Sequence, residues 1–213
     1  MNLQHDPNKT VTQGAPLETA QQVVLMLHGR GASAQDILSL SAYLPAPDFA
    51  FLAPQATQST WYPHSFMAPI EANEPGLSSA LGVVKTLVAR LHDGFGFAYE
   101  NIYLLGFSQG ACLALEYVAR NPQRYGGVFG LSGGLIGPEK LLPDYGGDLR
   151  QTPVFLGCSD VDPHIPKARV LESEKIFKDL NANVLTKLYE NFSHSVNDDE
   201  LEIVNRVIAT GSF

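Results

Sequence analysis

The feature that most constrains the fold of this chain is a regular alternation of short apolar runs with segments of helical periodicity. The run Val-Val-Leu-Met-Leu at residues 23–27 is apolar throughout, which is typical of a strand covered on both faces. Strands are predicted at residues 22–28, 49–53, 101–107, 127–131, 153–158 and 183–188, with a weaker edge strand at 10–13. Helices are predicted at residues 34–43, 76–92, 109–120, 167–180 and 198–209. This alternation predicts an α/β protein with a mostly parallel central sheet of about six or seven strands and helices on both faces.

A length of 213 residues allows one well-buried domain and is short for two. No internal repeat, low-complexity tract or charged linker divides the chain. We therefore predict a single domain over residues 1–213, with a partly irregular N-terminus at residues 1–20.

Two segments without clear periodicity, residues 54–75 and 132–150, interrupt the alternation. Loops of that length are usually functional or disordered, and the first carries Trp61, Tyr62, Phe66 and Met67, which argues against disorder. Both loops follow predicted strands, and sheets of this class bind ligands beyond the carboxyl ends of their strands. We expect the first loop to line the active site and these four side chains to bind substrate. The alternative is a loop that its own apolar side chains hold against the surface.

Composition excludes several classes of partner. The net charge of −8 argues against nucleic acid and anionic membrane surfaces, which both favour basic patches. No stretch approaches the ~20 apolar residues that span a bilayer, and the N-terminus lacks the basic start and apolar core of a secretory signal. Cys112 and Cys158 lie at unrelated positions, which favours reduced thiols over a disulfide. We expect a cytoplasmic protein.

The pentapeptide Gly-Phe-Ser-Gln-Gly at residues 106–110 lies between a predicted strand and a predicted helix. A serine on so sharp a turn is held in a strained conformation with its hydroxyl exposed, and larger residues in place of the glycines would collide there. The helix N-terminus that follows offers unpaired N–H groups to a developing anion. Ser108 is therefore the candidate nucleophile.

A serine hydroxyl needs a base within hydrogen-bond reach, and six histidines are available. His194 follows the last predicted strand and precedes the last helix, so its loop can fold back over the strand ends to Ser108. The alternative for His194 is a solvated surface histidine. The other five lie in the N-terminal segment, at the end of a strand or helix, or in loops: His5, His28, His64, His92 and His164.

The acid that orients the histidine should come from a loop between Ser108 and His194, because this arrangement runs serine, acid, histidine along the chain. Residues 159–166 offer Asp160 and Asp162. Asp162 is favoured because Pro163 makes its backbone rigid, whereas Asp160 is expected to form a hydrogen bond within the turn. His164 is two residues from Asp162 and is poorly placed to bridge that acid to Ser108.

An oxyanion hole needs two donors. One is the main-chain N–H of Gln109, directly after the nucleophile. The second is expected from the turn His-Gly-Arg-Gly at residues 28–31, which follows a central strand and would direct the main-chain N–H of Arg30 inward. The Arg30 side chain is expected to face solvent or the rim of the pocket. A metal site built from His28, His64, His164 and a carboxylate lacks the ligand spacing of zinc motifs, so we expect no metal and no cofactor.

Four motifs in this order resemble those of the phospholipase/carboxylesterase family of α/β-hydrolases, which includes small bacterial carboxylesterases and acyl-protein thioesterases. They are Leu-His-Gly-Arg-Gly at 27–31, Gly-Phe-Ser-Gln-Gly at 106–110, Asp-Val-Asp-Pro-His-Ile-Pro at 160–166 and Ser-His-Ser at 193–195. The resemblance implies the α/β-hydrolase fold, a triad of Ser108, Asp162 and His194, and an oxyanion hole of the Arg30 and Gln109 amides.

The chain also departs from that pattern. Thioesterase-like members usually have an apolar residue where Arg30 stands and an acidic residue where Ala32 stands, and residues 61–66 resemble a bacterial branch more closely. The resemblance therefore implies a serine hydrolase of small carboxylic esters, with thioesters and lysophospholipids as further candidates and a homodimer as a plausible assembly. Two alternatives are a non-catalytic binding protein on the same scaffold and a dienelactone-hydrolase-like enzyme, a group that typically uses cysteine as its nucleophile.

Overall fold

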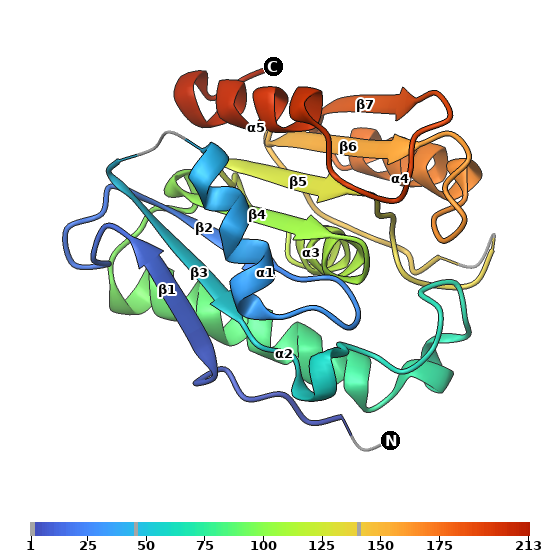
Figure 1. Ribbon diagram of the computed structural model, residues 1–213, viewed down its shortest axis with the longest axis horizontal. Coiled ribbons are helices and arrows are strands. Elements are labelled where there is room, and N and C mark those ends of the chain that lie inside the picture. The colour runs from blue at the N-terminus through green and yellow to red at the C-terminus, as the bar shows by residue number, and fades with distance from the viewer. Residues whose placement is uncertain (1–2, 45–46, 140–141) are drawn as a thin grey trace.

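A twisted central sheet organises the computed structural model, which describes residues 3–44, 47–139 and 142–213 (Figure 1). Within these residues the sheet has seven strands in the order β1-β3-β2-β4-β5-β6-β7, and β1 alone runs antiparallel to its neighbour. The strands are β1 (Thr10–Gly14), β2 (Gln22–Leu27), β3 (Phe49–Pro54), β4 (Ile102–Phe107), β5 (Gly127–Leu131), β6 (Pro153–Ser159) and β7 (Asn183–Tyr189). The predicted mostly parallel sheet is confirmed.

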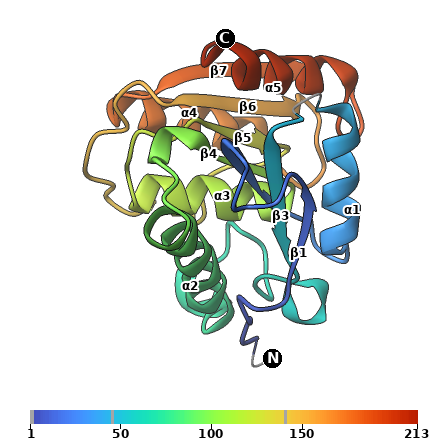
Figure 2. The ribbon, with the colours of Figure 1, turned by 90° about the vertical axis from the view of Figure 1, so that its left-hand side faces the viewer.

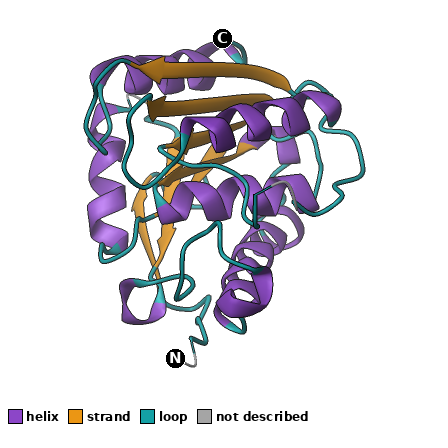
Figure 3. Ribbon diagram, turned by 90° about the vertical axis from the view of Figure 1, so that its right-hand side faces the viewer, coloured by secondary structure: helices purple, strands orange, loops and turns teal. Residues whose placement is uncertain are grey.

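Helices cover both faces of the sheet, as its apolar strands require. The α-helices are α1 (Ala34–Leu38), α2 (Gly76–Ala89), α3 (Gln109–Arg120), α4 (Lys167–Asp179) and α5 (Asp198–Thr210). Figure 2 shows α1 on one side of the sheet and α2 and α3 on the other, and Figure 3 shows the strands enclosed between the helical layers. Two apolar clusters fill the layers, one joining α1 and α5 to the sheet and the other joining α2, α3 and α4 to it.

Short helical turns extend two of the predicted helices. The helix predicted at 34–43 is α1 followed by a 3₁₀ turn, η1 (Ser39–Tyr43), and the one predicted at 76–92 is α2 followed by a π turn, η4 (Arg90–Gly94). Further 3₁₀ turns are η2 (Thr57–Ser59), η3 (Ile70–Asn73) and η5 (Tyr99–Asn101). The predicted irregular loop 54–75 therefore contains two short turns. Residues 1 and 2 of the predicted irregular N-terminus and residues 140 and 141 of the predicted loop 132–150 lie outside the described residues.

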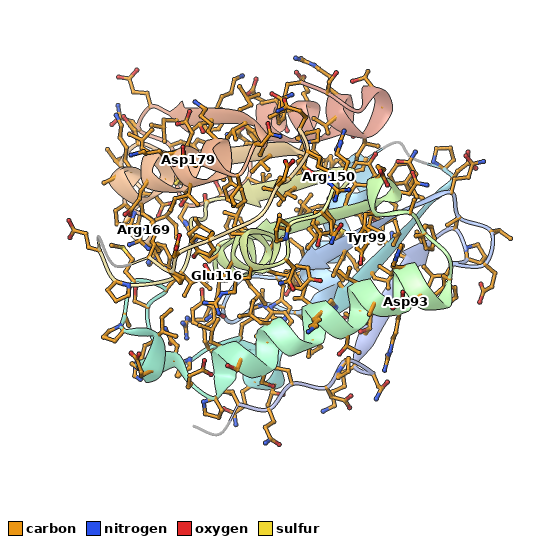
Figure 4. All side chains as sticks on the ribbon, turned by 180° about the vertical axis from the view of Figure 1, so that it is seen from behind. Asp93, Tyr99, Glu116, Arg150, Arg169 and Asp179 are labelled. Atoms are coloured by element: carbon orange, nitrogen blue, oxygen red, sulfur yellow. The ribbon has the colours of Figure 1, made fainter. Side chains whose placement is uncertain are left out.

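Two buried charged side chains fix the start of the loop that follows β5. Arg169 of α4 donates from Nη1 to the carbonyls of Leu135 and Gly137 at 2.7 and 2.8 Å. Glu116 of α3 accepts the N–H of Ile136 at 2.8 Å. Figure 4 labels both charged residues on the face that α3 and α4 cover. Polar main-chain groups that the loop buries are thereby paired, as their burial demands.

The carboxyl ends of the parallel strands lie along one edge of the sheet, and Figure 1 shows the arrowheads of β4 to β7 pointing the same way. The loops after β2, β3, β4, β6 and β7 therefore meet at this edge. None of the described helices has the length and apolar character that crossing a membrane requires.

Candidate active site

Ser108 occupies a strained turn between β4 and α3. Its backbone has φ 54° and ψ −117°, a conformation that L-residues rarely adopt. The two flanking glycines make the turn possible, because a Cβ on Gly106 would lie 2.3 Å from the carbonyl oxygen of Gly110, and one on Gly110 would lie 2.0 Å from that of Leu27. The sequence motif therefore corresponds to a backbone that only small residues can build.

His194 bridges Ser108 and Asp162 through both of its ring nitrogens. Nε2 lies 2.9 Å from the Ser108 Oγ, and Nδ1 lies 2.6 Å from the Asp162 Oδ2. In the tautomer that this arrangement requires, Nδ1–H donates to the carboxylate and Nε2 accepts the serine hydroxyl proton. Three residues predicted from separate motifs thus form one continuous hydrogen-bonded chain.

Asp162 is held as a carboxylate by a set of fixed donors. Its Oδ1 accepts the main-chain N–H groups of His164 at 2.8 Å and Ile165 at 3.0 Å, beside the bond to His194. Burial alone would raise the pKa of Asp162, but the hydrogen bonds from His194 and the two amides outweigh it and lower that pKa. A carboxylate in this state can fix the imidazole and stabilise it when it gains a proton.

Asp160 has a different role from the one predicted. Its Oδ1 accepts the main-chain N–H of Asn191 at 2.8 Å, in the loop that carries His194, rather than a group of its own turn. The N–H of Asp160 also donates to Tyr189 at the end of β7. Asp160 therefore ties the loop after β6 to the loop after β7.

Two aromatic rings enclose the imidazole of His194. The Phe107 ring lies with its centroid 5.0 Å away, and the His164 ring packs edge-on at 4.9 Å. As predicted, His164 does not bridge Asp162 to Ser108. Its ring instead contacts His194, which does. Sequence reasoning missed both contacts, although the position of Phe107 directly before Ser108 was a signal for the first.

The main-chain N–H groups of Arg30 and Gln109 both belong to residues that line the cleft above Ser108. Among the described residues, neither amide donates to a protein acceptor, whereas the neighbouring amide of Gly31 donates to Ser59. The turn is fixed from below by His28, whose Nδ1 donates to Gly29 and whose Nε2 accepts the N–H of Ala56. Burial lowers the pKa of His28, which keeps this support neutral.

The side chain of Gln109 holds the aromatic loop, a function that the sequence did not reveal. Its Oε1 accepts the N–H of Trp61 at 2.9 Å and its Nε2 donates to the carbonyl of Tyr62 at 2.8 Å. Arg30 reaches the same loop, donating from Nη1 to Pro63 at 3.0 Å and from Nη2 to His64 at 2.7 Å. Arg30 and Gln109, whose main-chain amides are the candidate oxyanion donors, therefore also hold in place the aromatic loop that forms one wall of the cleft.

A cleft of about 650 Å³ opens over Ser108 and His194. Tyr62 and Phe66 line it, as expected of the aromatic loop, but Trp61 and Met67 do not. The assignment of Trp61 to substrate binding needs correction, because its side chain has no exposed surface and its indole N–H donates to the carbonyl of His28 at 2.9 Å. Met67 is partly buried and packs against the core on the α2 side.

The remaining histidines do not join the chain of hydrogen bonds around Ser108. His5 packs its ring against Trp61 and makes a 2.8 Å hydrogen bond with the carbonyl of that residue. His92 stacks on Tyr99, and His64 lies exposed at the rim of the cleft. Across residues 3–44, 47–139 and 142–213, no group of three or more metal-ligating side chains converges to hold an ion.

Known proteins of similar sequence indicate the family of this chain. The sequence profile of the Phospholipase/Carboxylesterase family matches residues 9–212. An acyl-protein thioesterase 1 from Kluyveromyces lactis is 30% identical over 216 residues, covering 92% of this chain and 94% of that protein. The acyl-protein thioesterase 1 of Saccharomyces cerevisiae is 29% identical over 209 residues, covering 88% and 92%.

Solved structures of similar fold indicate the same family. The crystal structure of a phospholipase/carboxylesterase from Dyadobacter fermentans superposes with a TM-score of 0.93 at 46% identity, covering 97% of this chain and 98% of that one. Esterase PE8 shares the fold, with a TM-score of 0.75 at 23% identity. The chain belongs to the phospholipase/carboxylesterase family of α/β-hydrolases and is a carboxylic ester hydrolase.

Proposed function

We propose that this protein is a serine hydrolase that cleaves small carboxylic esters through an acyl-enzyme, with Ser108 as nucleophile, His194 as general base and acid, and Asp162 as the orienting carboxylate. The observation that carries the proposal is the pair of short contacts made by His194, 2.9 Å to the Ser108 Oγ and 2.6 Å to Asp162. An imidazole in that position can accept the serine proton as the hydroxyl attacks.

In the first half of the reaction, the Ser108 Oγ attacks the acyl carbon while His194 Nε2 takes the hydroxyl proton. Negative charge then develops on the carbonyl oxygen, and the main-chain N–H groups of Arg30 and Gln109 would stabilise it. His194 returns its proton to the leaving oxygen or sulfur as the bond to the acyl carbon breaks. In the second half, His194 activates a water molecule that releases the acid from Ser108.

Thioesters stay candidate substrates, which the likeness to the yeast proteins called acyl-protein thioesterase 1 supports. Lysophospholipids also stay candidates, which membership of the phospholipase/carboxylesterase family supports. The proposed steps apply equally to a thioester and to the carboxylic ester of a lysophospholipid, because Ser108 takes up the acyl group in the same way and only the leaving group differs. A homodimer and a cytoplasmic location stay predictions.

Replacement of the nucleophile tests the proposal. The variant Ser108→Ala should lose at least about 1,000-fold in kcat/KM on 4-nitrophenyl acetate, because a covalent step has no other nucleophile. Ser132→Ala is the matched control: Ser132 also follows a strand and has a positive φ of 54°, yet it makes no hydrogen bond with His194. Retained turnover in Ser108→Ala would overturn the proposal.

A further inference from the structure

Among the described residues that line the cleft, Arg30 is the one side chain with a permanent charge. It lies there with the imidazoles of His64, His164 and His194, and no aspartate or glutamate is among the described residues that line the cleft. This composition stands out in a chain whose net charge is −8 and whose acidic residues number 22 against 14 lysines and arginines. A cleft that contains a cation and no carboxylate favours anionic ligands, even on a protein whose net charge is negative.

Arg30 brings a cationic charge to this cleft without a carboxylate partner. Its two hydrogen bonds go to the neutral carbonyls of Pro63 and His64, and its guanidinium lies 6.0 Å from the ring centroid of Tyr62. No carboxylate of the described chain lies within 4.0 Å of it. A guanidinium has five N–H donors, so three remain for a ligand, and their geometry suits a carboxylate.

The one acid behind the cleft is shielded from it. The Asp162 side chain has no exposed surface, and its oxygens accept from His194 and from the amides of His164 and Ile165. The rings of His64 and His164, by contrast, belong to exposed residues of the cleft. An anionic group entering the cleft therefore meets the Arg30 guanidinium, two exposed imidazoles and no exposed carboxylate.

A second cavity of about 320 Å³ adjoins the first and has a different character. It shares His194 and Phe107 with the cleft, and Ile37, Leu40 and Val196 make its walls apolar. Asp36 lies on its lining, where a carboxylate of the substrate would be repelled. The apolar walls and Asp36 make this cavity suit an uncharged alcohol, which His194 on its lining can reach, and the acyl part then occupies the cleft that contains Arg30.

We propose that the enzyme selects esters whose acyl part carries a free carboxylate, that is, monoesters of dicarboxylic acids, and that the Arg30 guanidinium binds that carboxylate. The inference rests on the proposed serine-esterase function and specifies the substrate class of the same site. The second cavity accepts the uncharged alcohol.

A pair of matched substrates tests this selectivity. Mono-4-nitrophenyl adipate and 4-nitrophenyl methyl adipate share a leaving group and chain length, and they differ in whether the far end is a carboxylate or a methyl ester. At low ionic strength the wild type should give a kcat/KM about tenfold higher for the monoanion, and about 0.5 M NaCl should reduce that ratio because the cleft is open to solvent.

Variants locate the charge that is responsible. Arg30→Gln should bring the ratio of the two kcat/KM values to about one, whatever its effect on the neutral ester, and Arg30→Lys should keep part of the preference. Lys85→Gln, which removes one exposed charge from α2, is the matched control and should keep the wild-type ratio. A wild-type ratio at or below one, or a tenfold ratio that survives in Arg30→Gln, would overturn the inference.

The two proposals fail in distinguishable ways. Hydrolysis of the neutral diester that depends on Ser108, without preference for the monoanion, would refute the carboxylate selectivity and leave the serine-esterase function standing. Hydrolysis of neither adipate ester, nor of 4-nitrophenyl acetate, would refute both.

Discussion

Asp162 and Asp160 lie two residues apart in one turn, and the environment of each side chain decides what it can do. Asp162 accepts from His194 and from two amides, whereas Asp160 accepts the N–H of Asn191. The rigid backbone before Pro163 was enough to favour Asp162 from sequence. The partner of Asp160 could not be inferred, because Asn191 is 31 residues away and meets it only once β6 and β7 pair.

These contacts predict a large difference between two chemically identical substitutions. Asp162→Asn should reduce kcat on a 4-nitrophenyl ester by about 100- to 10,000-fold, because an amide at this point favours the wrong tautomer of His194. Asp160→Asn keeps an oxygen that can accept from Asn191 and should change kcat by less than about fivefold. Steady-state kinetics of the two variants measure the contrast, and the reverse ranking would show that the acid has been misassigned.

At the scale of single elements, β4, α3 and the turn between them leave little space for other side chains. The predicted bounds of α3 agree with the structure at both ends, since eleven of its twelve residues are buried and the pattern is strong. The turn approaches β2 closely, because Gly110 lies against the main chain of Leu27, and a larger residue at position 110 would collide with that strand.

A methyl group added at this contact should therefore be severely destabilising. In Gly110→Ala the new Cβ would lie 2.0 Å from the Leu27 carbonyl oxygen, and relief requires movement of β2 or α3. We expect a loss of more than about 3 kcal/mol in the free energy of unfolding, measured by urea denaturation. Gly82→Ala, on α2 with no atom within 4 Å of its Cβ, should instead stabilise by about 0.5–1 kcal/mol. Equal effects in the two variants would contradict this explanation.

The N-terminus of α5 contains a buried carboxylate that should make stability depend on pH. Glu200 is 1% exposed and accepts the N–H of Asn197 in a capping box, and burial raises the pKa of Glu200 to about 7. The folded state thus holds this proton more tightly than the unfolded chain does. The stabilisation is fully present below the unfolded pKa of about 4.5 and is lost as pH rises through about 7.

Glu200→Gln should remove this dependence, because the amide does not titrate and can still accept the Asn197 N–H. Relative to the variant, the wild type should lose up to about 3 kcal/mol of unfolding free energy between pH 5 and pH 8. Urea denaturation of both proteins at the two pH values measures the difference. Parallel pH profiles for wild type and variant would show that the Glu200 carboxyl does not titrate in this range.

For the whole molecule, the sequence predicted the fold far better than it predicted the walls of the cleft. Alternating apolar runs set the strands and helices, because each run must be buried by its neighbours. The 3₁₀ turn after α1 was not predicted, because periodicity does not separate it from the end of a helix. The loop at 54–75 was beyond prediction because contacts from distant residues fix it, such as those of Gln109 with Trp61 and Tyr62.

The burial of Trp61 illustrates the same limit for the candidate site. An aromatic side chain in an irregular loop is typical of a pocket residue. The indole N–H of Trp61 nevertheless donates to the carbonyl of His28 beneath the cleft. Tyr62, the next residue, does line the cleft. The choice between the two depends on the path of the loop over the sheet, which local sequence does not encode. The Ser108, Asp162 and His194 motifs were recognisable because each proposed role demands its own local turn.

The central claim is that Ser108 is the nucleophile of this hydrolase, and covalent labelling tests it most directly. A fluorophosphonate probe reacts with a serine that an adjacent base activates. Incubation followed by intact-mass and peptide mass spectrometry should show one label per chain, on Ser108, and none in Ser108→Ala. A label on another residue such as Ser132, or continued ester hydrolysis by fully labelled protein, would contradict the account.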